Sequence, residues 1–321
     1  MDRYYFSGSL TQQMHDYLIA MPDFKPLDIL ISQLDKSAIT KTIQWKREGF
    51  CRSLFIDSGA YSIHTGKAKV TVDEYIDYLN SIDDDIDVCA QLDTIPGHFG
   101  KTKNKEDYEE SAKKSWENFL YMRTKLKSPN KLMPVYHQGE DFSALANMLS
   151  WRDENGKQLD YVGISPSNDR SVKMKDIYLK EVEEFIARSD NPDVKTHLYG
   201  YTSMQGLSKY KCYSCDSISH RHISGYCKIL VPEFGVISVS QKSRTSKTKS
   251  NMSFLDTADE YNKKKVEEYI KNLGFTLDEV VASSSVRVAI TIHAIRDMLD
   301  DKYVYKKENV LRPKKLFSFQ A

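Results

Sequence analysis

The amino-acid sequence predicts an α/β fold, a (β/α)₈ TIM-like barrel followed by a helical C-terminal extension. Two observations lead to this prediction. Short apolar segments rich in β-branched and aromatic residues alternate along the chain with segments of helical periodicity, as in a mostly parallel sheet. About eight apolar segments fall within roughly 240 residues, which suits a closed barrel better than a doubly wound open sheet, the alternative architecture.

The expected strands share a short, mostly apolar run bounded by turn-forming residues. They are Leu27–Ser32, Ser53–Asp57, Asp87–Asp93, Lys131–His137, Asp160–Ser165, Lys195–Gly200 and Lys211–Asp216. The last strand of the barrel is expected at either Tyr226–Val231 or Gly235–Val239.

Helical segments lie between several of these strands. Thr71 and Glu74 form a capping-box pattern, which is typical of the first turn of a helix. Apolar residues recur on one helical face in Asp107–Leu126 and again in Ile177–Ala187. These segments are the expected outer helices of the barrel.

The C-terminal part of the chain has a different pattern, with charged helices and no further strand. Capping boxes begin two successive helices there, at Thr257 with Glu260 and at Thr276 with Glu279. We therefore expect a catalytic barrel over residues 1–250 and a helical extension packed on it over residues 251–321.

The composition excludes several classes of protein. Among 321 residues there are five cysteines, an odd number and too few to indicate a disulfide framework. The N-terminus has no secretory pattern, and no apolar run approaches the ~20 residues needed to cross a bilayer. We expect a cytoplasmic protein without a membrane partner.

A net charge of +1 gives no overall attraction to nucleic acid, so any such contact has to be local. Basic residues without an intervening acid occur in one stretch, at Lys242, Arg244, Lys247 and Lys249. A second basic group lies near the C-terminus, at Arg312, Lys314 and Lys315. Each group is either a phosphate-binding surface or a solvated segment.

Polar residues and glycines stand at or near the ends of six expected strands. The polar residues are Asp57, Asp93, Gln138 and Asp216, and the glycines are Gly163 and Gly200. Catalytic residues of (β/α)₈ barrels gather at the C-terminal ends of the strands, so these positions predict a pocket. An aspartate after a strand is also a common turn former or helix cap, which is the structural alternative for each one.

Six short segments resemble, in the same order, motifs of the tRNA-guanine transglycosylase family. They are Asp57-Ser-Gly-Ala-Tyr61-Ser62, Gln91-Leu-Asp93-Thr-Ile-Pro96, Val135-Tyr-His-Gln138-Gly139, Tyr161-Val-Gly163-Ile-Ser165, His197-Leu-Tyr199-Gly200 and Cys215-Asp216-Ser217. Together they span roughly residues 50–220, and the resemblance lies in the ordered set because each segment is short.

The resemblance implies a role for each matched residue. Asp216 corresponds to the nucleophile that attacks the sugar C1′ of a target guanosine, and Asp57 to the general acid and base. The matched binding residues are Asp93, Gln138 and the Gly163 backbone at the edge of the base, and Tyr61, Tyr199 and Gly200 around it. A glycosyl-aspartate intermediate of this kind follows the double-displacement logic of retaining glycosidases.

The chain departs from the family after Asp216. The family's zinc spacing is missing, although zinc ligands are available at Cys212, Cys215, His220, His222 and Cys227. The segment that would contact the tRNA anticodon loop is also replaced, here by Ser217–His222 with Arg221 as a candidate phosphate contact. These departures are similar to the DNA 7-deazaguanine transglycosylase branch of phages and bacteria, which implies a host cytoplasm for a phage-encoded chain.

The sequence thus predicts a pentosyltransferase that exchanges guanine in DNA for a free 7-deazaguanine base such as preQ0, without a required cofactor. The first alternative is a tRNA-guanine transglycosylase that lacks the zinc site. Two others are a catalytically silent nucleic-acid-binding barrel and a barrel enzyme acting on a small glycoside or sugar phosphate. Either polymer has to present its guanine outside the base stack.

Overall fold

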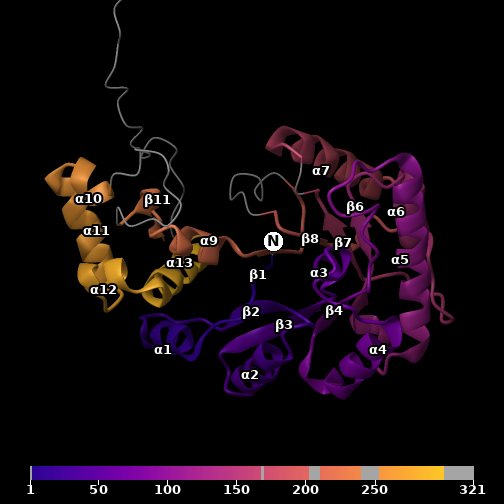
Figure 1. Ribbon diagram of the computed structural model, residues 1–321, viewed down its shortest axis with the longest axis horizontal. Coiled ribbons are helices and arrows are strands. Elements are labelled where there is room, and N and C mark those ends of the chain that lie inside the picture. Colours follow the sequence, from indigo (N-terminus) through magenta and orange to yellow (C-terminus); the bar gives the residue numbers. More distant parts are fainter. Residues whose placement is uncertain (1, 168–169, 202–209, 240–252, 300–321) are drawn as a thin grey trace, which may run out of the picture. The chain divides into compact units, whose positions relative to one another are not determined.

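The computed structural model describes residues 2–167, 170–201, 210–239 and 253–299 (Figure 1). The chain forms two compact units. The first comprises Met1–Ser9 and Pro26–Ile218, and the second comprises Leu10–Lys25 and Ser219–Ala321. The expected boundary at residue 250 therefore differs from the division found in the structure, which falls after Ile218.

The first unit is a barrel-shaped sheet of parallel strands, as the sequence predicts. The strands are β1 (Arg3–Ser7), β2 (Leu27–Ser32), β3 (Cys51–Asp57), β4 (Val88–Ala90), β5 (Leu132–Met133), β6 (Val135–His137), β7 (Tyr161–Ser165), β8 (Lys195–Leu198) and β9 (Ser214–Ser217). Their order around the sheet is β5-β4-β3-β2-β1-β9-β8-β7-β6. The two strands at the ends of this order are consecutive in the sequence, so the sheet curves round until it nearly closes.

One proline separates β5 from β6. Pro134 has no amide hydrogen and so cannot donate to a neighbouring strand. The Gln91 amide donates to the Met133 carbonyl at 2.9 Å on one side, and the Gly163 amide donates to the Pro134 carbonyl at 2.8 Å on the other. β5 and β6 therefore act as one kinked strand that bonds to β4 through its first half and to β7 through its second.

The expectation for the last strand of the barrel is wrong. That place is taken by β1, which pairs in parallel with both β2 and β9. The segments proposed for it instead form an antiparallel hairpin in the second unit, β10 (Lys228–Val231) with β11 (Gly235–Ser238). Four of the five residues of β1 are buried, so this strand has no alternating pattern to reveal it.

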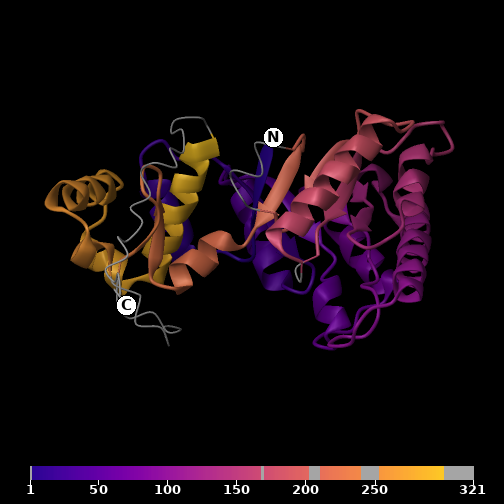
Figure 2. The same cartoon turned by 90° about the horizontal axis from the view of Figure 1, so that it is seen from above.

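Helices surround the strands of the first unit (Figure 2). They are α2 (Lys36–Arg47), α3 (Ala60–His64), α4 (Val72–Ser81), α5 (Lys105–Lys125), α6 (Phe142–Ser150) and α7 (Val172–Ala187), with short 3₁₀ turns η1 (Asp83–Asp85) and η2 (Pro129–Lys131). The capping box of Thr71 and Glu74 is confirmed at the start of α4. The helix expected over Asp107–Leu126 is α5, whose own capping box is formed by Asn104 and Asp107.

Large side chains fill the interior of the barrel. The buried cluster there consists of Tyr5, Leu30, Phe55, Ala90, Met133 and Val135, each from a different strand. Because these residues close the middle of the barrel, a ligand pocket can form only at one of its ends.

The second unit is built around the helix α13 (Ser284–Leu299). The other elements are α1 (Gln12–Ala20), α9 (Ser219–Gly225), the β10–β11 hairpin, α10 (Phe254–Thr257), α11 (Glu260–Asn272) and α12 (Leu277–Ala282). The capping box of Thr276 and Glu279 is confirmed, whereas α11 is capped by Asp259 and not by Thr257. Among the described residues, no helix is long and apolar enough to span a membrane.

Candidate active site

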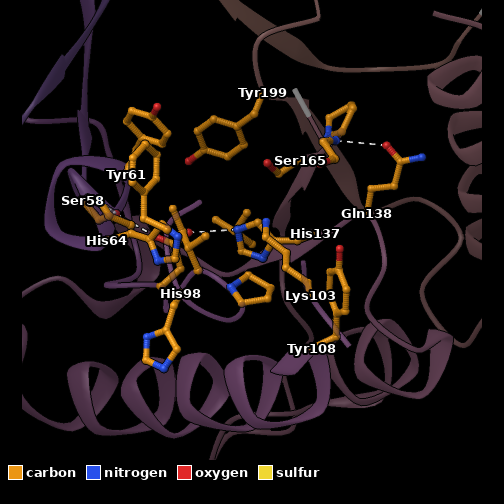
Figure 3. A pocket seen from close by; sticks show the side chains of 18 of the residues that line it. Ser58, Tyr61, His64, His98, Lys103, Tyr108, His137, Gln138, Ser165 and Tyr199 are labelled. Atoms are coloured by element: carbon orange, nitrogen blue, oxygen red, sulfur yellow. Dashed lines mark hydrogen bonds and ion pairs between the residues drawn. The ribbon is translucent and has the colours of Figure 1, made fainter. Parts of the chain in front are cut away.

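A cavity of about 560 Å³ opens in the first unit where the strands end. Its wall includes Asp57, which ends β3, and His137, which ends β6. Asp93, in the loop after β4, and Tyr199, directly after β8, also line it (Figure 3). The carboxyl ends of parallel strands thus supply the pocket, as expected for a (β/α)₈ barrel.

The turn after β3 fixes the Asp57 carboxylate. The Gly59 amide donates to Asp57 Oδ2 at 3.1 Å, and the backbone at Gly59 has a φ of +73°. A Cβ at this position would lie 2.8 Å from Ser32 Oγ and 2.9 Å from Leu34 Cδ1. Only glycine fits this turn, because both its left-handed backbone and its close neighbours exclude a side chain.

The pKa of Asp57 is raised from its ordinary value of 3.8 to about 7. Burial is the largest cause, the negative charge of Asp93 is the next, and Asp216 adds to the effect. A carboxyl group with this pKa is partly protonated at neutral pH, so it can both donate and accept a proton. That property is the one required of a general acid and base.

The raised pKa also has a consequence for stability. Folding favours the protonated form of Asp57, so the free energy of unfolding falls as the pH rises from about 4 to about 7 and stays lower above that window. We expect Asp57→Asn to raise the unfolding free energy at pH 8 by roughly 1–3 kcal/mol and to change it little at pH 4. Denaturant titrations at the two pH values measure this difference, with the exposed Asp193→Asn as the matched control. Equal effects at both pH values would contradict the assignment.

Asp93, His137 and Glu140 form a charged cluster at one side of the pocket. His137 Nε2 lies 2.9 Å from Asp93 Oδ2, and His137 Nδ1 lies 2.9 Å from Glu140 Oε1. Burial lowers the pKa of His137, but Glu140 and Asp93 raise it by more, to about 10. Burial raises the pKa of Asp93, but the hydrogen bond and the positive charge of His137 lower it by more, to below its usual range. At neutral pH the cluster is therefore an imidazolium held between the side chains of Asp93 and Glu140.

The remaining oxygen of Asp93 joins this cluster to the turn after β3. Ser58 Oγ donates to Asp93 Oδ1 at 2.7 Å. The charge that raises the pKa of Asp57 is thus held in place by His137 on one side and by Ser58 on the other. The proton affinity of Asp57 depends on this arrangement.

Removal of the central cation is expected to destabilise the fold. His137→Gln leaves two buried carboxylates without a cation, and we expect the unfolding free energy at pH 7 to fall by about 3 kcal/mol. The stabilisation from His137 is present below pH 6.5 and is lost as the pH rises towards about 10, so the deficit shrinks at alkaline pH. Denaturant titration measures it. The double variant His137→Gln/Glu140→Gln should lose less than the sum of the two single variants, and strict additivity would contradict the cluster.

Asp216 lies at the same end of the barrel, one residue before the end of β9. The residue is 8% exposed, and it is not among the described residues that line the cavity. Ser7 Oγ donates to its Oδ2 at 2.5 Å, and the Gly200 amide donates to its Oδ1 at 2.8 Å. One donor at the end of β1 and one in the loop just after β8 therefore hold the carboxylate in one orientation.

A fully buried histidine stands behind Asp216. His197 Nε2 lies 3.4 Å from Asp216 Oδ1, and His197 Nδ1 lies 2.5 Å from Ser214 Oγ. Ser214 in turn contacts the Tyr161 hydroxyl, and the ring of Tyr199 packs edge-on against His197 with centroids 4.6 Å apart. When Ser214 donates to Nδ1, the ring hydrogen stands on Nε2, which is near Asp216 but makes no hydrogen bond within the described residues. The resemblance assigns no role to His197.

Other expected binding residues have varied positions. Tyr61 is 60% exposed at the pocket on α3, and the hydroxyl of Tyr199 has no hydrogen-bond partner among the described residues. Gln138 lines the pocket, but its Oε1 accepts from the Ser167 amide (Figure 3). Its Nε2 donates to the Met174 carbonyl. The side-chain amide of Gln138 therefore already ties two backbone segments together.

Gly163 has a packing role in the structure. Its amide is used by the Pro134 carbonyl, and a Cβ there would lie 2.8 Å from the Tyr199 ring. Gly163 thus makes room for Tyr199. The sequence instead predicts that its backbone contacts a base. Gly200 acts on Asp216 through its amide, at a backbone φ of +58°.

The predicted nucleic-acid contacts lie elsewhere in the chain. Arg221 is exposed on α9 of the second unit. Lys242, Arg244, Lys247, Lys249, Arg312, Lys314 and Lys315 all lie outside the described residues. Within the described part of the chain, no group of three histidine, cysteine or acidic residues is arranged to hold a metal ion.

Sequence reasoning missed His137, the residue that organises the charged cluster. It selected the neighbouring Gln138, although His137 is the last residue of the strand and Glu140 follows it by three. A histidine that ends a strand and precedes an acid by three residues is the pattern that could have identified the cluster. No family model matches the chain, and no curated protein matches it significantly.

Proposed function

We propose that this protein is a guanine transglycosylase that exchanges guanine in DNA for a free 7-deazaguanine base through a glycosyl-Asp216 intermediate. The observation that carries the proposal is the pair of unlike carboxylates at one end of the barrel. Asp57 has a pKa of about 7, and Asp216 is held by donors from Ser7 and Gly200. Two carboxylates in different environments can divide the acid–base and nucleophilic roles.

In the first step, a carboxylate oxygen of Asp216 bonds to C1′ of the target nucleotide while the bond from C1′ to the base nitrogen breaks. The Asp57 carboxyl gives its proton to the departing guanine and becomes a carboxylate. In the second step, Asp57 takes a proton from the incoming base, whose nitrogen bonds to C1′ as the bond to Asp216 breaks. Two inversions at C1′ retain the anomeric configuration.

The pocket has features suited to a planar base. Tyr61 and Tyr199 present aromatic surface, and the Tyr199 hydroxyl, which has no partner among the described residues, offers a hydrogen bond. Asp93 is ionised and each of its oxygens has a fixed partner, so it offers oriented acceptor lone pairs to the N–H groups of a guanine edge. A buried donor or acceptor that must be matched gives strong discrimination among bases.

The test is incorporation of label. The full chain is incubated with labelled guanine or preQ0 and, separately, with single-stranded DNA, duplex DNA and tRNA. Label in DNA, lost in Asp216→Ala, supports the proposal. Label confined to tRNA establishes the alternative substrate, and label in none of the polymers overturns the transglycosylase assignment.

A further inference from the structure

The loop between Asp93 and α5 has an unusual composition. Residues 94–104 contain no acid, but they include His98, Phe99, Lys101 and Lys103. All four line the mouth of the cavity, together with Tyr61 and His64 of α3. We call these six residues the rim.

The loop is held at both ends, so the rim has a defined place. The Thr94 amide donates to Ser115 Oγ at 2.8 Å, and Asn104 caps α5 by accepting from the Asp107 amide at 2.8 Å. Phe99 and His64 pack edge-on across the mouth, with ring centroids 6.2 Å apart. The rim therefore joins the loop to α3 on the opposite side.

Two exposed aromatic rings flank the mouth. Phe99 is 63% exposed and Tyr61 is 60% exposed. Exposing a large aromatic ring to water does not stabilise the fold. Proteins that bind single-stranded nucleic acids stack bases on exposed rings of this kind.

The lysines of the rim have no described acidic partner. Lys101 and Lys103 form no ion pair within the described residues, whereas Lys105 and Lys114 of the adjacent helix pair with Glu109 and Glu110. Burial, with the nearby charges of Lys103 and His98, lowers the pKa of His64. Positive charge is thus crowded at the mouth, and an anion there would relieve the crowding.

Charge changes sign between the mouth and the interior of the pocket. The interior carries Asp57 and Asp93, with Glu140 behind His137, while the rim carries the lysines. A phosphate is repelled by the carboxylates and attracted by the rim, whereas a neutral base can enter. This polarity fits a polymer whose base is inside and whose backbone stays outside.

We propose that the rim binds a single DNA strand, with phosphates on Lys101 and Lys103 and a base flanking the target stacked on Phe99. The proposal rests on the proposed function for its choice of polymer. It places the main strand contact beside the pocket, on the loop after β4, and independently of the basic stretch Lys242–Lys249.

Binding of a guanine-free, fluorescent single-stranded DNA oligonucleotide tests the rim without base exchange. Anisotropy titrations of the full chain over a range of KCl concentrations give the affinity and its salt dependence. For Lys101→Gln/Lys103→Gln we expect weaker binding and a log–log salt slope smaller by about 1.4, since each phosphate contact on a single strand contributes about 0.7. The control Lys113→Gln/Lys114→Gln removes the same charge from the exposed part of α5 and should keep the wild-type slope.

Stacking is tested by Phe99→Ala, which should weaken binding about tenfold or more at constant salt. Tyr261→Ala, which removes a 69% exposed ring from α11, is the control and should leave the affinity unchanged. An unchanged salt slope in Lys101→Gln/Lys103→Gln overturns the proposal. So does a loss of affinity in Phe99→Ala that is no larger than the loss in Tyr261→Ala. Tighter binding of an RNA strand of the same sequence overturns the choice of DNA.

The outcomes separate the rim from the catalytic assignment. Rim-dependent strand binding without label exchange supports the rim and overturns the proposed function. Label exchange that is unaffected in the rim variants at low substrate concentration supports the function and overturns the rim.

Discussion

Asp216→Asn is expected to lower the rate of base exchange by at least ~10⁴-fold, because no covalent intermediate can form without the carboxylate. The substitution keeps the shape of the side chain, and the Gly200 amide can still donate to the Oδ1 atom. The fold should therefore survive, and binding of the free base should change little. Single-turnover release of labelled guanine measures the rate.

Trapping provides a second measurement of the same variant. Wild-type protein incubated with substrate and then denatured should carry a covalent nucleic-acid adduct, and Asp216→Asn should carry none. Asp193→Asn, whose side chain is 95% exposed, is the control and should behave as wild type. An adduct in the Asp216 variant would show that another residue is the nucleophile.

Asp57→Asn is expected to lower exchange by about 10²–10⁴-fold, the usual contribution of a general acid or base. Because the pKa of Asp57 is about 7, its protonated form dominates below pH 7 and its carboxylate above. Departure of guanine needs the acid, so its rate should fall as the pH rises through about 7. Capture of the incoming base needs the carboxylate, so its rate should fall as the pH drops through the same value.

Separate pH profiles of the two half-reactions test this division of roles. Release and capture should show opposite limbs with a common midpoint near pH 7, and overall turnover should be highest near that pH. In Asp57→Asn both limbs should disappear. The control variant Asp193→Asn should keep both limbs. Wild-type profiles in which release and capture titrate in the same direction would contradict the assignment of Asp57.

Much of the barrel can be predicted because each expected strand is a local pattern. Leu27–Ser32 and Tyr161–Ser165 are apolar runs between turn-forming residues, and both are strands in the structure. β1 escapes prediction because its apolar run is only three residues long, Tyr4–Phe6, and such a short run does not by itself indicate a strand. The sequence prediction assigns a segment of the β10–β11 hairpin to the barrel sheet. This assignment is wrong because distant parts of the chain determine which strands pair, and no local pattern contains that information.

The site is predictable to the level of strand ends but not of side-chain directions. Asp57 and Asp93 are found together because parallel strands bring their carboxyl ends to one edge. The choice between His137 and Gln138 depends on which of two adjacent side chains meets Asp93, and neighbouring residues of a strand face opposite sides. Four of the six rim residues, His98, Phe99, Lys101 and Lys103, lie in a loop without periodicity, so only its composition marks this part of the rim in the sequence.

The charged cluster also helps to hold the barrel together at Pro134, where β5 and β6 are separated. β5 and β6 are short and each bonds to one neighbour, so the end of β6 has few backbone hydrogen bonds to hold it. The contact of His137 with Asp93 fastens that end to the loop after β4, and its contact with Glu140 fixes the turn that follows β6. If Asp93 binds a base as proposed, these contacts serve both the fold and the binding site, so a substitution at any of the three side chains should affect stability and base binding together.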